Sequence, residues 1–452
     1  MSLTKHGLTR ALNRKDTLAL AVGAMIGWGW MIVTAGWLSR GGTVGAVLGL
    51  TMVGAVASVI ALIYGELVSA MPEVGGEHVY SLRALGFTGS FVCTWSLLLV
   101  YVSVGGFEAV ALSTVVSEFF PDYKRVFLWG MAGYDVYLSW ALIGLAGAIM
   151  MTLINVRGIK LSAIFQTTVT AFVIGAGVFL IVGAFGWGSA DNIEPLFVSG
   201  AAGVIGVAAM APFLYTGFDV IPQTAEEIDL SPRTVGFLIP CAVVLATTFY
   251  FLVIMGVSLA LPQETIQTSE LATADAAGAV WGRVGKQVLL LAGVAGIVTS
   301  WNAFLVGGSR LMFALGESGM LPRWLAVLHP RYRTPHRAII AFGIFSAVAP
   351  FFGRQMAIWI VDAGSFAVVV TYFFVSVSFI RLRLDEPELL RPFRLPGGVA
   401  MGWLGVACTV ALATLYMPWS PSALVWPHEW GMVALWSTLG LVLYSCAERP
   451  IA

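Results

Sequence analysis

Four acidic residues interrupt long apolar stretches of this sequence: Glu66, Glu108, Asp219 and Asp362. Burying an ionised side chain in a membrane is costly, so such an acid is expected to carry a cation or proton, or to pair with a base. Glu66 lies near the end of its stretch, which favours a structural ion pair. Asp219 and Glu108 are the candidates for ion coupling, and the role of Asp362 stays open.

Two apolar stretches are themselves interrupted by helix-breaking residues. Residues 23–30 read GAMIGWGW, and residues 211–219 read APFLYTGFD. Glycine and proline weaken a helix locally and leave backbone N–H and C=O groups unpaired, so a polar solute could bind to them. Matched breaks of this kind are typical of transporter sites between inverted repeats. The alternative for any single glycine is close helix packing.

The composition sets the environment in which these residues must lie. The chain has 452 residues, of which 58% are hydrophobic and only 11% charged, and its mean hydropathy is +0.88. A soluble domain averages about 25% charged residues, so this chain is predicted to be an all-α integral membrane protein. We expect about twelve transmembrane spans, near residues 17–38, 43–69, 88–117, 137–156, 161–186, 201–225, 235–260, 286–312, 337–353, 355–380, 398–417 and 429–447.

The distribution of positive charge predicts the orientation. With the N-terminus in the cytoplasm, eighteen of the 24 Lys and Arg residues lie on the cytoplasmic side, as the positive-inside rule requires. Both termini are therefore expected to be cytoplasmic. The remaining six are expected on the outside: Arg40, Lys124, Arg125, Arg283, Lys286 and Arg354.

Several classes of function find no support in the sequence. The formal net charge is zero, so nothing indicates a nucleic-acid partner. The four cysteines lie singly in apolar runs, which favours packing over a disulfide or metal site. We find no HExxH motif or other convergent catalytic set and expect no enzyme. No repeated filter motif points to a channel, and no histidine lies within a span to relay protons.

Several motifs together resemble the amino acid–polyamine–organocation (APC) superfamily of permeases. They are the Gly-Trp-Gly of residues 27–29, YGEL at 64–67 with MPEVGGEHVY at 71–80, NVRGIK at 155–160, GFD at 217–219 with AEE at 225–227, and GMLP at 319–322. The resemblance covers residues 20 to about 395. It implies a leucine-transporter (LeuT-type) fold with a 5+5 inverted repeat, in which helices 1 and 6 are broken.

The resemblance also implies boundaries along the chain. Residues 1–16 would form a cytoplasmic tail, 17–186 the first five-helix repeat and 187–380 the second, inverted repeat. Residues 381–452 would add two C-terminal helices and a tail. The partners implied are the lipid bilayer and a small-molecule substrate, whereas the oligomeric state stays open.

By the same resemblance, the substrate would bind at the two breaks. Trp28 and Gly29 would offer N–H groups and Met25 a carbonyl, while Phe213 and Thr216 would play the corresponding parts on helix 6. The full set implied for substrate binding is Met25, Gly27, Trp28, Gly29, Phe213, Tyr215, Thr216, Gly217 and Phe304. Trp28 departs from the small hydroxyl residue usual in the family and cannot accept a hydrogen bond, which weakens the case for an ordinary α-amino acid.

A hydroxyl pair, Thr299 and Ser300, lies about halfway along helix 8. In sodium-coupled relatives, hydroxyls there join helix 1 carbonyls around Na⁺. The alternative is that both hydroxyls bond back to the preceding helical turn. Helix 5 lacks the lysine of sodium-independent relatives and has Gln166 and Thr167 in that stretch. We therefore expect Na⁺ as the coupling ion and no other cofactor, with proton coupling through Asp219 or Glu108 as the alternative.

The sequence thus predicts a plasma-membrane permease that takes up an amino acid by cation-coupled alternating access. The crowding of aromatic residues near the breaks keeps a carboxylate-free amine or polyamine open as substrate. An amino acid exchanger is a further alternative, because the fold supports both modes.

Overall fold

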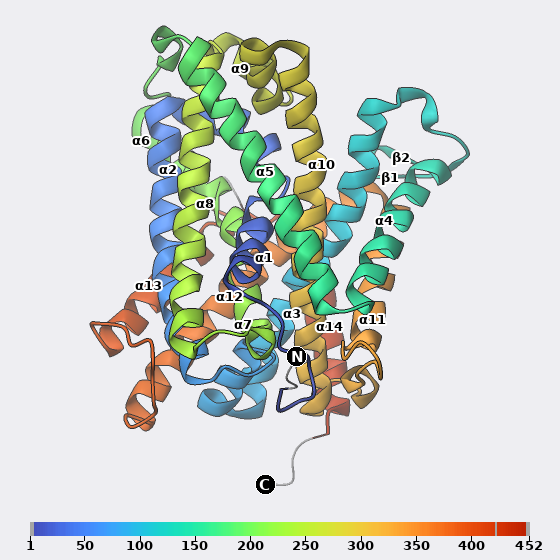
Figure 1. Ribbon diagram of the computed structural model, residues 1–452, viewed down its shortest axis with the longest axis vertical. Coiled ribbons are helices and arrows are strands. Elements are labelled where there is room, and N and C mark those ends of the chain that lie inside the picture. Colours follow the sequence, from blue (N-terminus) through green and yellow to red (C-terminus); the bar gives the residue numbers. More distant parts are fainter. Residues whose placement is uncertain (1–3, 421–422, 449–452) are drawn as a thin grey trace.

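The structure is a computed structural model that describes residues 4–420 and 423–448, and it is almost entirely helical (Figure 1). Long helices run roughly along the long axis of the molecule. The α-helices of its first half are α1 (Arg14–Ile26), α2 (Gly29–Ala70), α3 (Glu77–Phe119), α4 (Leu138–Val156), α5 (Ile159–Trp187), α6 (Gly200–Met210) and α7 (Val220–Gln223). Those of its second half are α8 (Pro232–Ala260), α9 (Gln263–Thr268), α10 (Ala272–Glu317), α11 (His336–Val348), α12 (Gly353–Asp385), α13 (Val399–Thr414) and α14 (His428–Cys446).

Short 3-10 helices and one hairpin make up the rest of the regular structure. The 3-10 helices are η1 (Pro121–Tyr123), η2 (Ala190–Ile193), η3 (Pro212–Tyr215), η4 (Ala225–Glu227), η5 (Arg323–Ala326) and η6 (Ala349–Phe352). Strands β1 (Phe127–Met131) and β2 (Tyr134–Tyr137) pair antiparallel around Ala132 and Gly133. Both turn residues have positive φ, as a two-residue hairpin turn requires. The sequence motifs did not indicate this hairpin.

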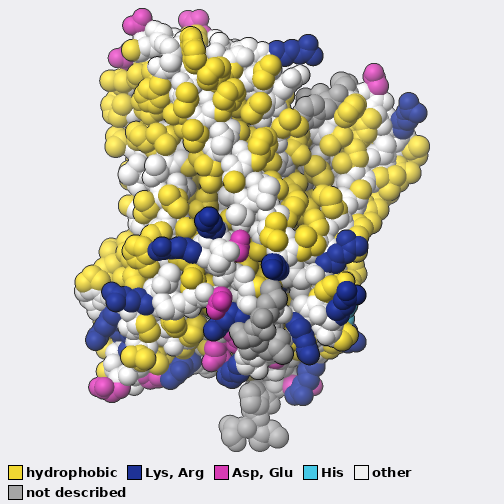
Figure 2. Space-filling view, in the orientation of Figure 1, with side chains coloured by type: hydrophobic (Ala, Val, Ile, Leu, Met, Phe, Trp, Pro, Cys, Tyr) yellow, Lys and Arg dark blue, Asp and Glu magenta, His cyan; other side chains and the backbone are white. Residues whose placement is uncertain are grey.

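The bundle has two ends, a terminal end and a hairpin end. The terminal end carries residues 4–13, α7 and the end of α14, and it lies at the bottom of Figure 1. The hairpin end carries β1, β2 and α9, at the top. Lys and Arg side chains gather over the lower part of the face in Figure 2, towards the terminal end, whereas apolar side chains dominate above.

Among the described residues, seven helices are long and apolar enough to cross a membrane, or eight if the bent α6–α7 pair is counted as one span. The sequence predicted twelve spans, and the difference lies partly in helices that continue through a kink. Helix α2 has 42 residues, about 63 Å at 1.5 Å per residue, roughly twice the hydrocarbon thickness. Gly42, with φ +69°, divides it at the boundary between predicted spans 17–38 and 43–69.

Other predicted spans correspond to shorter or merged elements. α11, η6 and α12 together form one apolar stretch, His336–Asp385, across the predicted boundary at 353–355. α13 and α14 have only 16 and 19 residues. α1 has 13, because it ends at the break that the glycines predicted.

The packing places α1 inside the bundle. It contacts α5, α8 and α10, while α3 packs along α12 and α10, and α2 packs along α8 and α6. α7 contacts α1 and α10. α1 and α7 therefore lie among continuous helices, which hold the unwound segments in place, whereas α6 packs mainly along α2.

The predicted pairing of Glu66 is confirmed. Its carboxylate accepts hydrogen bonds from the Arg383 guanidinium and the Leu395 backbone N–H, and Arg391 lies 3.1 Å away. This cluster joins α2 to the end of α12 and the segment that follows it. Since the carboxylate is fully used by these partners, Glu66 is a structural residue.

Candidate functional site

The first break lies where α1 ends at Ile26 and α2 begins at Gly29. Gly27 has φ +41° and ψ −142°, a conformation that side-chain-bearing residues rarely adopt. Its N–H still bonds to the Gly23 carbonyl at 3.2 Å. A Cβ added at Gly27 would lie 3.3 Å from Ser300, so the break lies directly against α10.

The second break separates α6 from α7, and the pair bends by 49°. The chain stays non-α-helical from Ala211 to Asp219, and Gly217 within this segment has φ +131°. A Cβ there would lie 2.6 Å from the Ala24 Cβ and 3.1 Å from the Met25 backbone nitrogen. The two breaks, nearly two hundred residues apart in sequence, are therefore in direct contact and together make up the candidate site.

Asp219 holds the second break in shape. Its Oδ1 accepts the Gly217 N–H at 2.7 Å, and its Oδ2 accepts the Tyr101 hydroxyl at 2.7 Å. The side chain is fully buried. Because both oxygens already have donors, this carboxylate stabilises the unwound backbone.

Tyr250 on α8 joins the two breaks and was not singled out from the sequence. Its hydroxyl lies 2.6 Å from the Met25 carbonyl, to which it donates, and 3.1 Å from the Leu214 carbonyl. The Met25 carbonyl, which the sequence predicted to bind substrate, thus accepts a hydrogen bond from the protein itself in this arrangement. Tyr215 likewise donates to the Leu50 carbonyl at 3.0 Å. A lone tyrosine in an apolar helix gives no signal of such a role.

The hydroxyl pair and Glu108 meet at the first break. Ser300 donates a hydrogen bond to Glu108 Oε1, joining α10 to α3. Both hydroxyls also contact the preceding turn of α10, as the alternative for this pair expected: Thr299 donates to the Gly296 carbonyl at 2.9 Å, and Ser300 Oγ lies 3.1 Å from the same carbonyl. Three of the four residues proposed for coupling, Glu108, Thr299 and Ser300, therefore lie together, whereas Asp219 lies at the other break.

Several buried polar groups near the breaks form no hydrogen bond of ordinary geometry among the described residues. They include Glu108 Oε2 at the first break and Thr216 Oγ1, beside the Tyr372 hydroxyl, at the second. Buried polar atoms are nearly always hydrogen-bonded, so orphaned ones indicate where a ligand, an ion or a water binds. Such groups lie at both breaks.

Aromatic side chains cover this region. The Trp28 ring packs onto α10 so closely that a Cβ at Gly293 would lie 2.1 Å from it. Phe304 is buried and packs against Tyr101 with ring centroids 5.6 Å apart. Phe213 is partly exposed and packs against the core. The predicted aromatic residues thus lie on elements that contact the breaks.

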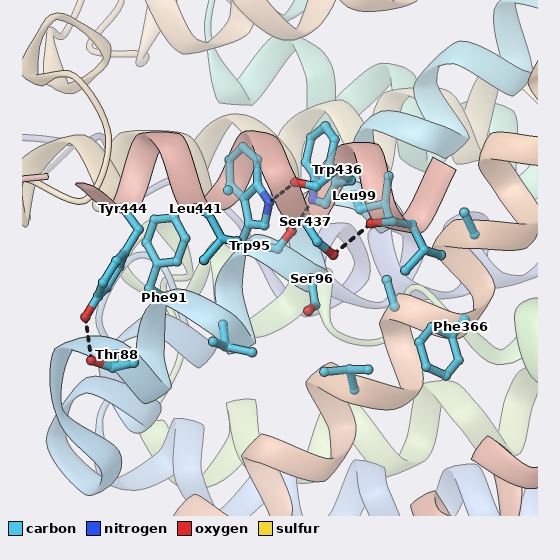
Figure 3. A pocket seen from close by; sticks show the side chains of 16 residues that line it. Thr88, Phe91, Trp95, Ser96, Leu99, Phe366, Trp436, Ser437, Leu441 and Tyr444 are labelled. Atoms are coloured by element: carbon cyan, nitrogen blue, oxygen red, sulfur yellow. Dashed lines mark hydrogen bonds between the residues drawn. The ribbon is translucent and has the colours of Figure 1, made fainter. Parts of the chain in front are cut away.

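A separate cavity of about 380 Å³ lies between α3, α12 and α14 (Figure 3). Trp95 and Trp436 stack there with centroids 4.4 Å apart, and each ring N–H donates to the other's backbone carbonyl at 2.9 Å. Thr88 and Tyr444 form a hydrogen bond at one end. The lining is mostly apolar and includes no residue of either break, so we do not assign the site to this cavity.

Comparison with known proteins agrees with this arrangement. A family model described as amino acid permease matches residues 12–443, nearly the whole chain. The chain belongs to the amino acid permease family. It is accordingly a transporter and a multi-pass membrane protein, and not an enzyme.

Individual relatives of the permease differ in what they are named for. It is 27% identical to the methylthioribose transporter of Bacillus subtilis, over 86% of this chain and 84% of the relative. It is also 27% identical to the branched-chain amino acid permease BcaP of the same organism, over 98% and 94%. The vacuolar cationic amino acid transporter 8 of Arabidopsis thaliana is 24% identical, over 97% and 74%.

The N-terminal segment closes the terminal end of the permease. Leu8 is fully buried against Val74 and Phe313. Leu12 forms a parallel bridge with Ile228, in the segment that follows the second break. Next to this bridge, Glu227 forms a fully buried ion pair with Arg310 of α10 at 2.7 Å. The segment after α7 is thus fastened to both the N-terminus and α10.

His6 adds a titratable contact to this closure. Its Nδ1 lies 2.5 Å from Glu226, its Nε2 lies 3.8 Å from Glu317, and Lys5 is the nearby cation. The hydrogen bond with Glu226 raises the pKa of His6 above its ordinary value of 6.5. Protonation therefore favours the docked segment, and this stabilisation is lost as the pH rises through the raised pKa.

We expect His6→Gln to lower the thermal unfolding midpoint most below about pH 6.5, and this difference from wild type to shrink as the pH rises through the raised pKa of His6. The measurement is thermal unfolding of both purified proteins across this range. Lys5→Gln is the control, because it removes a charge from the same segment whose partner, Glu73, is exposed. A difference between wild type and His6→Gln that is constant with pH would contradict the assignment.

Proposed function

We propose that the permease takes up an amino acid across the plasma membrane by alternating access, as a cation symporter. The direct contact between the two breaks, with a buried polar group at each that forms no hydrogen bond of ordinary geometry, carries the proposal. Free N–H groups at a helix end suit a carboxylate, and free carbonyls suit an ammonium. The relatives named for branched-chain and cationic amino acids support this class of substrate.

The proposal keeps the architecture expected from the sequence. It takes residues 17–186 and 187–380 as two inverted five-helix repeats within about twelve spans, followed by two additional helices. It also takes the terminal end as cytoplasmic, since most Lys and Arg residues fall there under the positive-inside rule. Closure of that end by residues 4–12 then corresponds to a state that is shut towards the cytoplasm.

The proposed substrate site comprises the backbone at Met25, Gly27, Trp28 and Gly29 and residues 213–217. Phe304 and Phe213 would line it. The Tyr250 hydroxyl donates a hydrogen bond to the Met25 carbonyl in the present arrangement. A substrate ammonium that binds this carbonyl would have to displace the hydroxyl or bind the carbonyl oxygen together with it.

For the coupling ion we propose Na⁺ at Thr299 and Ser300. The Glu108 carboxylate beside Ser300 supports this choice, because hard cations prefer oxygen ligands. The unpartnered Glu108 Oε2 supplies a further oxygen. A proton on Glu108 is the alternative, since an unpaired buried carboxyl is readily neutralised by protonation.

Uptake into proteoliposomes tests both parts of the proposal. Radiolabelled leucine should accumulate under an inward Na⁺ gradient, and Thr299→Ala with Ser300→Ala should raise the Na⁺ concentration required for half-maximal uptake. The cause is the loss of two oxygen ligands. Uptake that is unchanged when choline replaces Na⁺ would exclude Na⁺ coupling and leave the proton.

A carboxylate-free solute is the second candidate. Trp28 packs over the first break, where it adds an aromatic face and only one N–H. One relative is named for methylthioribose, a sugar that carries neither a carboxylate nor an ammonium. Strong competition by putrescine, equal to that of the best amino acid, would favour an amine, whereas weak competition supports an amino acid.

A further inference from the structure

Glu77 lies next to the second break but takes no part in the site described above. It is the first residue of α3 and is fully buried. Gln223, the last residue of α7, donates a hydrogen bond from Nε2 to Glu77 Oε2. The Gly75 N–H bonds in turn to the Gln223 carbonyl at 3.5 Å. Glu77 therefore contacts the short helix that follows the break.

The surroundings of Glu77 contain no positive charge. Within residues 4–420 and 423–448, no Lys, Arg or His forms an ion pair with it, whereas buried Glu66 and Glu227 each pair with arginine. The titratable groups that face it are neutral or acidic: Tyr64, Tyr80, Tyr101, Tyr372, Cys93 and Asp219. Position in the first turn of α3 favours a negative charge, but weakly compared with the cost of an unpaired buried carboxylate.

The neutral groups around Glu77 can accommodate a proton. The Tyr64 hydroxyl lies beside the Glu77 carboxyl and interacts with it, and Glu77 Oε1 has no other hydrogen-bond partner among the described residues. A carboxylate only accepts hydrogen bonds, whereas a carboxylic acid also donates one. A proton on Oε1 would give the Tyr64 oxygen a donor while Oε2 continues to accept from Gln223.

We propose that the Glu77 carboxyl is a proton-binding site whose access to the terminal end is controlled by Gln223 of α7. In the closed arrangement the carboxyl holds its proton. When the segment after the second break moves away, Gln223 leaves, water reaches Glu77, and the O–H bond breaks to give a hydrated carboxylate and a proton in the cytoplasm. This inference rests on the proposed function for two points: the movement of the segment after the second break, and the cytoplasmic location of the terminal end.

The protonation state can be tested without any substrate. Infrared spectra of the purified permease near neutral pH should contain the C=O band of a protonated carboxyl that Glu77→Gln lacks. The double variant Glu77→Gln, Gln223→Glu exchanges the acid and the amide, and should restore the band. Glu73→Gln is the control, because Glu73 is more exposed and pairs with Lys5. Identical carboxyl bands in wild type and Glu77→Gln would overturn the proposal.

Transport supplies the second readout. In proteoliposomes, leucine uptake by wild type should change when the pH gradient across the membrane is reversed. Uptake by Glu77→Gln should be the same in both gradients. Leucine counterflow should persist in both proteins. Counterflow in the variant shows that it is folded. A pH response retained by Glu77→Gln would overturn the proposal. Absence of leucine counterflow in wild type contradicts the leucine substrate alone, because the infrared result still decides the protonation of Glu77.

Discussion

Gly296→Ala should reduce substrate uptake by about tenfold to a hundredfold and leave insertion into the membrane unaffected. A Cβ at this position of α10 would lie 2.0 Å from the Gly27 carbonyl oxygen and 3.2 Å from the Trp28 nitrogen. Atoms cannot approach so closely, so α10 and the first break must separate. Distortion of this kind costs about 1–3 kcal/mol, and here it falls on the backbone that we propose binds substrate.

Gly175→Ala is the matched control. Gly175 also lies within a long helix, α5, but a Cβ there has no neighbour within 4 Å. Alanine is the better helix former, so uptake and stability should stay at wild-type levels or improve slightly. Initial uptake rates, corrected for the amount of protein in the liposomes, are the measurement. Wild-type uptake by Gly296→Ala would place the transport path elsewhere.

The second large effect is expected on stability. Arg310→Met should lower the free energy of unfolding by about 3–5 kcal/mol, because it leaves the Glu227 carboxylate buried without its partner. Both side chains are essentially inaccessible, and two hydrogen bonds of 2.7 and 3.1 Å join them. Unfolding by denaturant in detergent, followed by circular dichroism, measures the change.

The double variant Arg310→Met, Glu227→Gln separates charge from packing. Removing both charges should recover most of the loss, since a buried ion pair itself contributes little net stability. Arg381→Met is the control, because the Arg381–Asp385 pair is more than half exposed and its loss should have little effect. A double variant no more stable than Arg310→Met would show that Arg310 acts through packing.

Features that depend on a few neighbouring residues could be predicted from the sequence. The break at Gly27 and the bend before Asp219 lie where glycine and proline occur, because these residues change the allowed backbone conformations locally. The membrane environment followed from 58% hydrophobic and 11% charged residues. The motifs identified the family because each of them is a short, continuous run of residues that can be recognised without the tertiary structure.

Partners distant in the chain could not be predicted in this way. Nothing around Tyr250 indicates that its hydroxyl meets the Met25 carbonyl, 225 positions earlier. The span count also differed, because α2 continues through a kink at Gly42 and His336–Asp385 forms one apolar stretch, so both pass the boundaries that hydropathy suggests.

The sequence by itself therefore determined that this protein spans a membrane, belongs among the permeases and unwinds at two places. Only the tertiary structure decided which groups the buried acids meet. Glu66 and Glu227 have arginine partners, Glu108 meets Ser300, and Glu77 meets Gln223 and Tyr64. The physical reason is that the cost of a buried charge depends on what lies within a few ångströms of it, and helix packing alone brings those groups together.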